Sequence, residues 1–190
     1  MKTTSYFVGI SLNSKWFVDL FTDLRKYLEE NNLENIIELQ NILSLHITLY
    51  YLSNKISPKT RKEFFTDIDN MNKTYPKLKI SPLGIKYFKK NNSFMIGYLD
   101  CTNKELICKL HTELASKCKQ TEVLDNEFPY LPHITLFKVK DYIIHKYKDK
   151  IEAIIKKHID SLSRMNVFSG FNLYCDNSKF HPEIQIIMTK

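Results

Sequence analysis

Hydrophobic positions along the chain follow two spacings, one typical of strands and the other of helices. Short aromatic and β-branched runs predict strands at residues 6–12, 43–51, 78–88, 93–99 and 131–139, and near 165–175 and 184–189. Apolar residues three or four positions apart predict four helices. The first follows Asn13 and Ser14 and ends near Asn31, and the others lie within residues 60–71, 106–114 and 144–159.

The predicted order is strand, helix, strand, helix, strand, strand, helix, strand, helix, strand, strand. Asn91 and Asn92 favour a turn between two of the strands. Hairpins mixed with helices favour an α+β fold with largely antiparallel sheets. Because no linker or low-complexity tract divides the chain, we expect residues 1–190 to form a single domain.

One tripeptide occurs in two of the predicted strands, as His46-Ile47-Thr48 and as His133-Ile134-Thr135. Each copy continues with leucine and an aromatic residue. Side chains alternate between the two faces of a strand, so histidine and threonine share one face. The alternation predicts Leu43, Leu45, Ile47 and Leu49 in the core, and Ser44, His46, Thr48 and Tyr50 on the opposite face. It also places Ile134 and Leu136 in the core, and His133, Thr135 and Phe137 opposite.

The repeat indicates an internal duplication with a pseudo-two-fold axis, which would bring the two His/Thr faces together across a cleft. Two imidazoles on opposite sides of a phosphate can act as general base and general acid. Two threonine hydroxyls can hold the non-bridging oxygens and stabilise the charge of the transition state. A single His-x-Thr is ordinary in a protein with six histidines, but two matching copies favour a metal-independent phosphodiesterase.

At these residues the chain resembles the two-histidine (2H) phosphoesterase superfamily. This group includes the RNA 2′,3′-cyclic phosphodiesterases, historically named 2′-5′ RNA ligases. The resemblance runs from the first strand and helix through both motifs to Phe171-Asn-Leu-Tyr174. It implies a bilobal fold of two intertwined lobes, with antiparallel sheets lining a central cleft and helices outside. It also implies His46 and His133 as the catalytic pair, Thr48 and Thr135 as phosphate ligands, and no cofactor.

The resemblance also suggests further contacts to the substrate. Many members carry a basic residue where Lys138 stands, so phosphate contact is expected, although regular alternation puts Lys138 on the Ile134 face. Aromatic residues near the motifs are candidates for stacking on a nucleobase, with core packing as the alternative for each. They are Tyr6, Tyr50, Tyr130, Phe137 and Tyr174, of which Tyr130 is the first choice.

Members of the superfamily cleave several phosphodiesters, and the motif does not choose among them. Some open 2′,3′-cyclic phosphates on RNA, and others, several of them viral, destroy 2′-5′ oligoadenylates or cyclic dinucleotide messengers and so blunt innate immunity. The Lys-, Asn- and Ile-rich composition is typical of an AT-rich genome, and the compact chain fits a viral messenger-degrading enzyme. The alternatives are an RNA-processing 2′,3′-cyclic phosphodiesterase, a nucleotide-binding module without turnover and a general RNA-binding protein.

Charge and cysteine usage constrain the setting more than the chemistry. A formal net charge of +7 suits an anionic ligand and plain solubility equally well. The four cysteines form no Cys-x-x-Cys pair and no zinc spacing, which indicates reduced thiols in a cytosolic or nuclear setting. Without a signal-peptide or membrane-spanning pattern, we expect a cytoplasmic protein, in the host cytoplasm if viral, with a nucleotide substrate and no obligate protein partner.

Other histidines and lysines are interpreted as structural. His111, His145, His158 and His181 lack a hydroxyl residue two positions later, and we expect them at the surface or at helix ends. The lysines of residues 146–150 and 156–157 fit the solvated face of a helix better than an RNA track. No third donor is spaced to complete a metal site with the motif histidines.

Overall fold

A computed structural model describes residues 5–52, 58–75, 78–91, 93–118, 129–162, 170–176 and 184–187. Its helices are α1 (Lys15–Glu30), α2 (Pro58–Thr74), α3 (Lys104–Cys118) and α4 (Asp141–Asp160), with a short 3-10 helix, η1 (Ile42–Ser44). Its strands are β1 (Ser5–Ser11), β2 (Ile37–Leu39), β3 (His46–Leu52), β4 (Pro82–Asn91), β5 (Phe94–Cys101), β6 (Ile134–Lys140), β7 (Gly170–Asp176) and β8 (Ile184–Ile187). The predicted order is confirmed, with β2 and η1 as additions.

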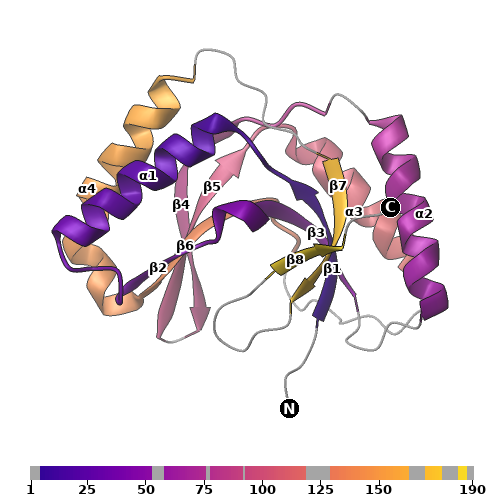
Figure 1. Cartoon of the computed structure of the whole chain (residues 1–190), viewed down its shortest axis with the longest axis horizontal. Coiled ribbons are helices and arrows are strands. Elements are labelled where there is room, and N and C mark those ends of the chain that lie inside the picture. The colour runs from indigo at the N-terminus through magenta and orange to yellow at the C-terminus, as the bar shows by residue number, and fades with distance from the viewer. Residues whose placement is uncertain are drawn as a thin grey trace.

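The strands form two antiparallel sheets, in the orders β3-β1-β7-β8 and β2-β6-β5-β4. Helices α2 and α3 contact the first sheet, and α4 contacts the second. Figure 1 shows α1 and α4 together on one side of the molecule and α2 and α3 on the other, with both sheets between them. The α+β class with antiparallel sheets and outer helices is therefore confirmed. Strands β3 and β6, which carry or adjoin the two tripeptides, contact each other.

Helix α1 shows how the sequence pattern builds the core. Its apolar residues recur at three- and four-residue intervals, so they form one stripe along the helix. The buried members of this stripe are Phe17, Leu20, Phe21, Leu24 and Leu28. The start of α1 is joined to the end of α4, because the Trp16 indole Nε1–H donates to the carbonyl oxygen of His158 at 2.9 Å. Burial of each large side chain contributes about 1.5–3 kcal/mol.

Both motif strands contain a β-bulge at the leucine that follows the threonine. Opposite β1, Thr48 pairs with Gly9 and Tyr50 with Val8, which leaves Leu49 as the extra residue. Opposite β5, Thr135 pairs with Tyr98 and Phe137 with Gly97, which leaves Leu136 as the extra residue. An extra residue reverses the alternation of faces beyond it. The matching bulges are a structural sign of the pseudo-two-fold repeat.

The bulges correct three predicted orientations. Tyr50 and Phe137 lie in the core, at 6% and 1% exposure, and not on the histidine faces of their strands. Lys138 was predicted on the Ile134 face but lies on the face shared with Thr135. Gly97 makes room for the displaced ring, because a Cβ there would lie 2.3 Å from Cζ of Phe137.

A second correction concerns the residues before the first motif. Regular strand alternation predicted Leu43 in the core and Ser44 opposite, but Leu43 is 83% exposed and Ser44 is buried. The reason is that these residues form η1, whose start is capped by the Asn41 side chain accepting a hydrogen bond from the Leu43 backbone N–H at 3.0 Å. Parts of the predicted turn at Asn92 and of the two terminal strands lie outside the described residues.

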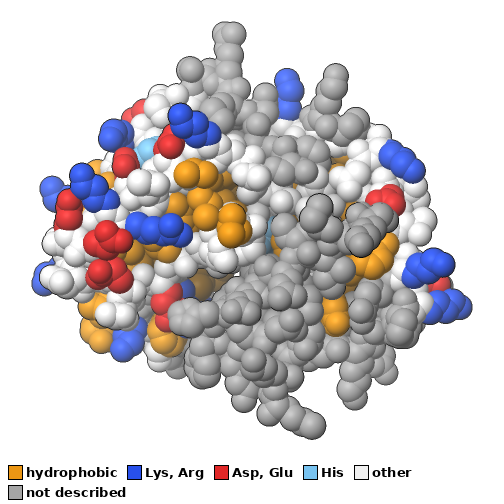
Figure 2. All heavy atoms as spheres, in the orientation of Figure 1, with side chains coloured by type: hydrophobic (Ala, Val, Ile, Leu, Met, Phe, Trp, Pro, Cys, Tyr) orange, Lys and Arg blue, Asp and Glu red, His pale blue; other side chains and the backbone are white. Residues whose placement is uncertain are grey.

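The outer surface of α1 and α4 carries charges of both signs. In Figure 2, lysine and arginine side chains alternate with acidic ones over this half of the molecule. Several of the lysines pair with acids one helical turn away, as in Lys26–Glu30, Lys148–Glu152 and Lys156–Asp160. This arrangement is a solvated face, as expected for the lysines of α4. No helix in the described part of the chain is both long and apolar enough to span a membrane.

Candidate active site

The two motif histidines have the same backbone anchor. The Nδ1–H of His46 donates to the carbonyl oxygen of Ser44 at 2.7 Å, and that of His133 donates to Leu131 at 2.7 Å. In each case the acceptor belongs to the residue two positions earlier. Because Nδ1 must carry the proton to donate, the neutral ring has Nε2 as its basic nitrogen. The fold thus prepares two imidazoles for proton transfer at Nε2.

An aromatic pair holds the His46 ring on the first sheet. Its centroid lies 4.7 Å from that of Phe7 and 5.0 Å from that of Tyr174. These two rings stack on each other at 4.8 Å with an interplanar angle of 4°. Gly9 admits Tyr174 to this position, because a Cβ there would lie 3.0 Å from the tyrosine Cε2. The rings remove water from one side of His46.

A second aromatic pair holds the His133 ring. Phe88 of β4 and Tyr98 of β5 each lie 5.3 Å from it, with interplanar angles of 82° and 70°. Tyr98 is also the strand partner of Thr135. Each sheet therefore supplies a histidine, two aromatic neighbours and, two residues after the histidine, a threonine.

The structure brings the two motifs together. The Tyr130 hydroxyl, three residues before His133, donates to the Thr48 carbonyl oxygen at 2.7 Å. The charges of the two histidines also interact, because a protonated His133 lowers the pKa of His46. The juxtaposition expected from the sequence is therefore present.

Burial weakens the affinity of both histidines for a proton. Desolvation lowers the pKa of His46 to about 4, with the Ser44 carbonyl opposing this change and the charge of His133 adding to it. Desolvation also lowers the pKa of His133, again opposed by a carbonyl, that of Leu131. Both rings are therefore neutral at pH 7 in the free protein. A bound phosphate anion would raise both pKa values and let one ring carry the proton that an acid needs.

The lowered pKa of His46 predicts acid-sensitive stability. Between pH 6.5 and 4 the unfolded chain binds a proton at this residue that the folded chain does not, so stability falls as pH falls. We expect this site to contribute on the order of 3 kcal/mol of that loss. Urea unfolding at pH 7 and pH 4.5 should show a smaller pH dependence in His46→Gln than in the wild type. His145→Gln, at an exposed position on α4, is the control. An equal change in unfolding free energy with pH in all three proteins would contradict the assignment of this acid sensitivity to His46.

Thr48 and Thr135 occupy equivalent places, two residues after their histidines and directly before the bulges. Both side chains are half-buried, on the histidine faces of β3 and β6. A hydroxyl at each place can donate to a phosphate oxygen lying between the two imidazoles.

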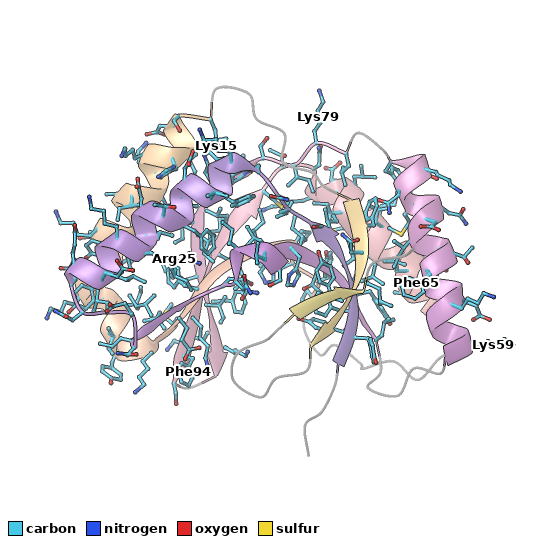
Figure 3. The ribbon with its side chains drawn as sticks, viewed as in Figure 1. Lys15, Arg25, Lys59, Phe65, Lys79 and Phe94 are labelled. Atoms are coloured by element: carbon cyan, nitrogen blue, oxygen red, sulfur yellow. The ribbon has the colours of Figure 1, made fainter. Side chains whose placement is uncertain are left out.

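The bulge at Leu136 brings Lys138 to the same face of the second sheet as Thr135. Its Nζ lies 3.7 Å from a carboxylate oxygen of Glu38 on β2 and 4.2 Å from the ring centroid of Phe94. Phe94 lies at the tip of the β4–β5 hairpin (Figure 3). The lysine thus lies on the histidine face of the second sheet, held by Glu38 and Phe94.

The aromatic residues that were expected to stack on a nucleobase are buried, are packed against the core or have a ring face covered by another side chain. Tyr50 and Phe137 are buried, and Tyr6 lies on the face of β1 opposite Phe7, against the core. Tyr174 is fully buried with one face covered by Phe7. The Tyr130 ring stacks on His111 at 3.9 Å, so one of its faces is also covered. The site brings Tyr174 and Tyr130 to the motifs as supporting side chains and does not bring Tyr6, Tyr50 or Phe137 there.

Other aromatic side chains line the histidine faces instead. Phe7, Phe88 and Tyr98 contact the catalytic candidates. Tyr51, which the first bulge turns to the His46 face, is 42% exposed and lies 5.6 Å from Phe7. The missing signal was the register between strands, because the alternation within one strand does not say which residues of other strands lie opposite.

The structure also shows where three of the other histidines and two of the cysteines lie. His111 lies in α3 against β3 and is half-buried, whereas His145 is exposed. His158 lies 2.9 Å from a carboxylate oxygen of Asp23 and joins α4 to α1; His181 lies outside the described residues. Cys101 and Cys108 are free thiols. Among the described residues no group of three or more His, Cys, Asp or Glu could hold a metal ion, and metal independence stays a prediction.

The fold and the paired motifs define a two-histidine phosphoesterase, a superfamily whose members are phosphodiesterases. The family model described as the AKAP7 2'5' RNA ligase-like domain matches residues 4–177, and the chain belongs to this family. A comparison with curated protein sequences gives no match.

Solved structures share the fold at low sequence identity. LigT of Escherichia coli has a TM-score of 0.60 at 13% identity, over 97% of this chain and 95% of its own. TT0787 of Thermus thermophilus gives the same four values. Usb1 of Kluyveromyces marxianus has a TM-score of 0.51 at 10% identity, over 99% of both chains. These matches establish the fold over nearly the whole chain.

Proposed function

We propose that the protein is a metal-independent phosphodiesterase that cleaves nucleotide phosphodiesters, with His46 and His133 as its general base and general acid. The observation that carries the proposal is the identical anchoring of both imidazoles through Nδ1, which orients Nε2 of each ring for proton transfer. One proton must leave the attacking oxygen and one must reach the leaving oxygen, so two such rings complete the reaction.

In this mechanism the phosphate lies between the two motifs. One neutral imidazole accepts the proton of the attacking hydroxyl or water through Nε2, and the protonated partner donates to the leaving oxygen. Thr48 and Thr135 donate hydrogen bonds to the non-bridging oxygens, where charge builds up in the transition state. Lys138 contacts a phosphate at the edge of the site.

The nature of the ligand follows from the surroundings of the motifs. On the histidine faces, the exposed ring of Tyr51 suits a base and the half-buried ammonium of Lys138 suits a phosphate. LigT of Escherichia coli, with the same fold, has been solved with 3′-AMP, NADP⁺ and ATP, which supports a nucleotide ligand here. Within this class we favour 2′-5′-linked oligonucleotides or cyclic oligonucleotide messengers. Destruction of such messengers in the cytoplasm, as an immune-evasion enzyme, is the corresponding biological role.

The two halves of the site differ at the position just beyond the bulged leucine and its aromatic neighbour. The first half has Tyr51 there and the second has Lys138, both on the histidine faces. We infer that a nucleobase stacks on Tyr51, the exposed ring of the first half, while Lys138 binds an anionic group on the other side. The substrate would thus lie across both sheets in a fixed orientation, with its base at Tyr51 and its anionic group at Lys138.

Replacement of Tyr51 by alanine should therefore weaken substrate binding. Stacking of one base on an aromatic ring contributes about 1–3 kcal/mol, so we expect KM to rise about 5- to 150-fold while kcat changes little. Steady-state kinetics on the preferred substrate measure both constants. Tyr142→Ala, at a 74% exposed position on α4, serves as the control. An unchanged KM for Tyr51→Ala would exclude this ring as the base platform.

Product analysis tests the proposed function. The purified protein is incubated in EDTA with 2′-5′ oligoadenylate, cyclic dinucleotides and an oligonucleotide ending in a 2′,3′-cyclic phosphate, and the products are identified by mass spectrometry. We expect cleavage of the 2′-5′ linkage or of a cyclic messenger. A product ending in a cyclic phosphate would show attack by the neighbouring hydroxyl, and a monoester would show hydrolysis. Binding without any product would identify a nucleotide-binding module and overturn the proposal.

A further inference from the structure

Two stacked rings cap the outer edge of the first motif strand. The rings of His111, from α3, and Tyr130, from the segment before β6, lie 3.9 Å apart with an interplanar angle of 4°. The Tyr130 hydroxyl donates to the Thr48 carbonyl oxygen at 2.7 Å. The His111 Nδ1–H donates to the next carbonyl oxygen, that of Leu49, at 2.6 Å. One stacked pair therefore serves two consecutive carbonyl groups.

These carbonyl groups belong to the β-bulge of the first motif. Among the described residues, strand β3 is the edge strand of its sheet and pairs only with β1. The bulge also leaves its extra residue, Leu49, out of the ladder with β1. A buried carbonyl group without a partner is costly, and a bulge without fixed partners can shift. The hydrogen bonds from Tyr130 and His111 therefore fix the bulge directly after Thr48, the threonine that would face the phosphate.

The same pair is joined to the second motif by a short, stiff segment. Only Leu131 and Pro132 separate Tyr130 from His133, and the proline ring fixes one backbone angle of the segment. His133 is itself anchored in this segment, through its hydrogen bond to the Leu131 carbonyl. A short chain of contacts therefore runs from Thr48 of one sheet to His133 of the other.

We propose that the stacked His111–Tyr130 pair is a positioning device that sets the separation of the two motifs, and so of Thr48 from His133, for in-line reaction. This inference rests on the proposed function. Burial raises the pKa of the Tyr130 hydroxyl, which keeps it a donor. Neither side chain reacts with substrate in this scheme; they act through the backbone of residues 48 and 49 and through the segment leading to His133.

Removal of the tyrosine hydroxyl should impair turnover more than binding. Tyr130→Phe keeps the stacked ring and deletes only the donor to Thr48. Because small misplacements of catalytic groups can cost about 10²-fold in rate, we expect kcat to fall about 10- to 100-fold. We expect KM to change less than about threefold, because binding groups remain. Tyr27→Phe, at a half-buried position on the outer helix α1, is the matched control and should retain full activity.

Conservative replacement of the histidine distinguishes positioning from packing. The side-chain amide of asparagine can take the place of Nδ1–H, so His111→Asn should retain more kcat than His111→Leu, although leucine fills the space as well. A ranking with leucine equal to or above asparagine would show that only packing matters and would overturn the proposal.

A double-mutant cycle and hydrogen exchange complete the test. In a Thr48→Val background, Tyr130→Phe should cost less than about threefold in kcat, because residues acting through one another are not additive. Amide exchange at residues 46–50 should quicken in Tyr130→Phe and not in Tyr27→Phe. Full additivity, or unchanged exchange at the bulge, would overturn the proposal. The exchange measurement needs no turnover. If the wild-type protein is inactive, the proposed function is refuted, and the exchange rates alone still test whether the His111–Tyr130 pair fixes the bulge.

Discussion

Replacing His46 or His133 with alanine should lower kcat by about 10²–10⁴-fold, the range that one general acid or base contributes. The reason is structural: Nδ1 of each ring donates to a backbone carbonyl, which leaves Nε2 as the basic nitrogen that can take part in proton transfer. Single-turnover kinetics on the preferred substrate would isolate the chemical step. The double variant should be little slower than the poorer single variant, because acid and base act in one transition state.

His145→Ala is the matched control for these variants, because this histidine is exposed on α4, away from both motifs. It should keep wild-type rates. Retention of more than about a tenth of wild-type kcat in either His46→Ala or His133→Ala would contradict acid–base roles, since loss of such a group costs at least about 10²-fold. Circular dichroism and an unfolding midpoint for each variant separate loss of chemistry from loss of fold.

The second large effect is expected at the threonines. Thr48→Val and Thr135→Val keep the shape of the side chain and remove the hydroxyl, and loss of one donor to a developing oxyanion costs about 10²–10³-fold in kcat. KM should change little, because the hydrogen bond strengthens as charge develops. Serine at either position should restore much of the rate, since it returns the donor.

Thr112→Val provides the control for the threonine variants. Thr112 is exposed on α3, and its hydroxyl donates to the Cys108 carbonyl within the helix. Its replacement should leave kcat unchanged. An increase of KM at constant kcat in the Thr48 and Thr135 variants would instead assign the hydroxyls to ground-state binding and contradict a role in the transition state.

The sequence was sufficient to predict the elements that local patterns encode. The apolar stripe of α1 is buried in the core as expected, and the two His-Ile-Thr copies identify the strands that meet at the site. Their pairing predicted a shared site because a repeat within one chain indicates two related halves. Helices and motifs are local properties, so a single chain reveals them.

What could not be predicted depends on contacts between distant segments. The bulges at Leu49 and Leu136 appear only when β3 pairs with β1 and β6 with β5. They turned Tyr50 and Phe137 inward, and Tyr51 and Lys138 toward the site. His111 was predicted at the surface or at a helix end because it has no hydroxyl residue two positions later. Its contact with the Leu49 carbonyl, 62 residues away in the sequence, could not be predicted. Strand register and tertiary hydrogen bonds leave no mark in the spacing of one segment.

The dependence of the rate on the leaving group distinguishes a general acid from a general base, and so separates the roles of His46 and His133. The substrates are two nucleoside phosphodiesters with the same attacking hydroxyl, one with an alkoxide leaving group and one with 4-nitrophenolate, which leaves without protonation. Rates are measured for the wild type, His46→Ala and His133→Ala. We expect the variant that lacks the acid to recover most of its rate on the 4-nitrophenyl ester, and the variant that lacks the base to stay slow on both substrates. Equal impairment of both variants on both substrates would contradict paired acid–base catalysis.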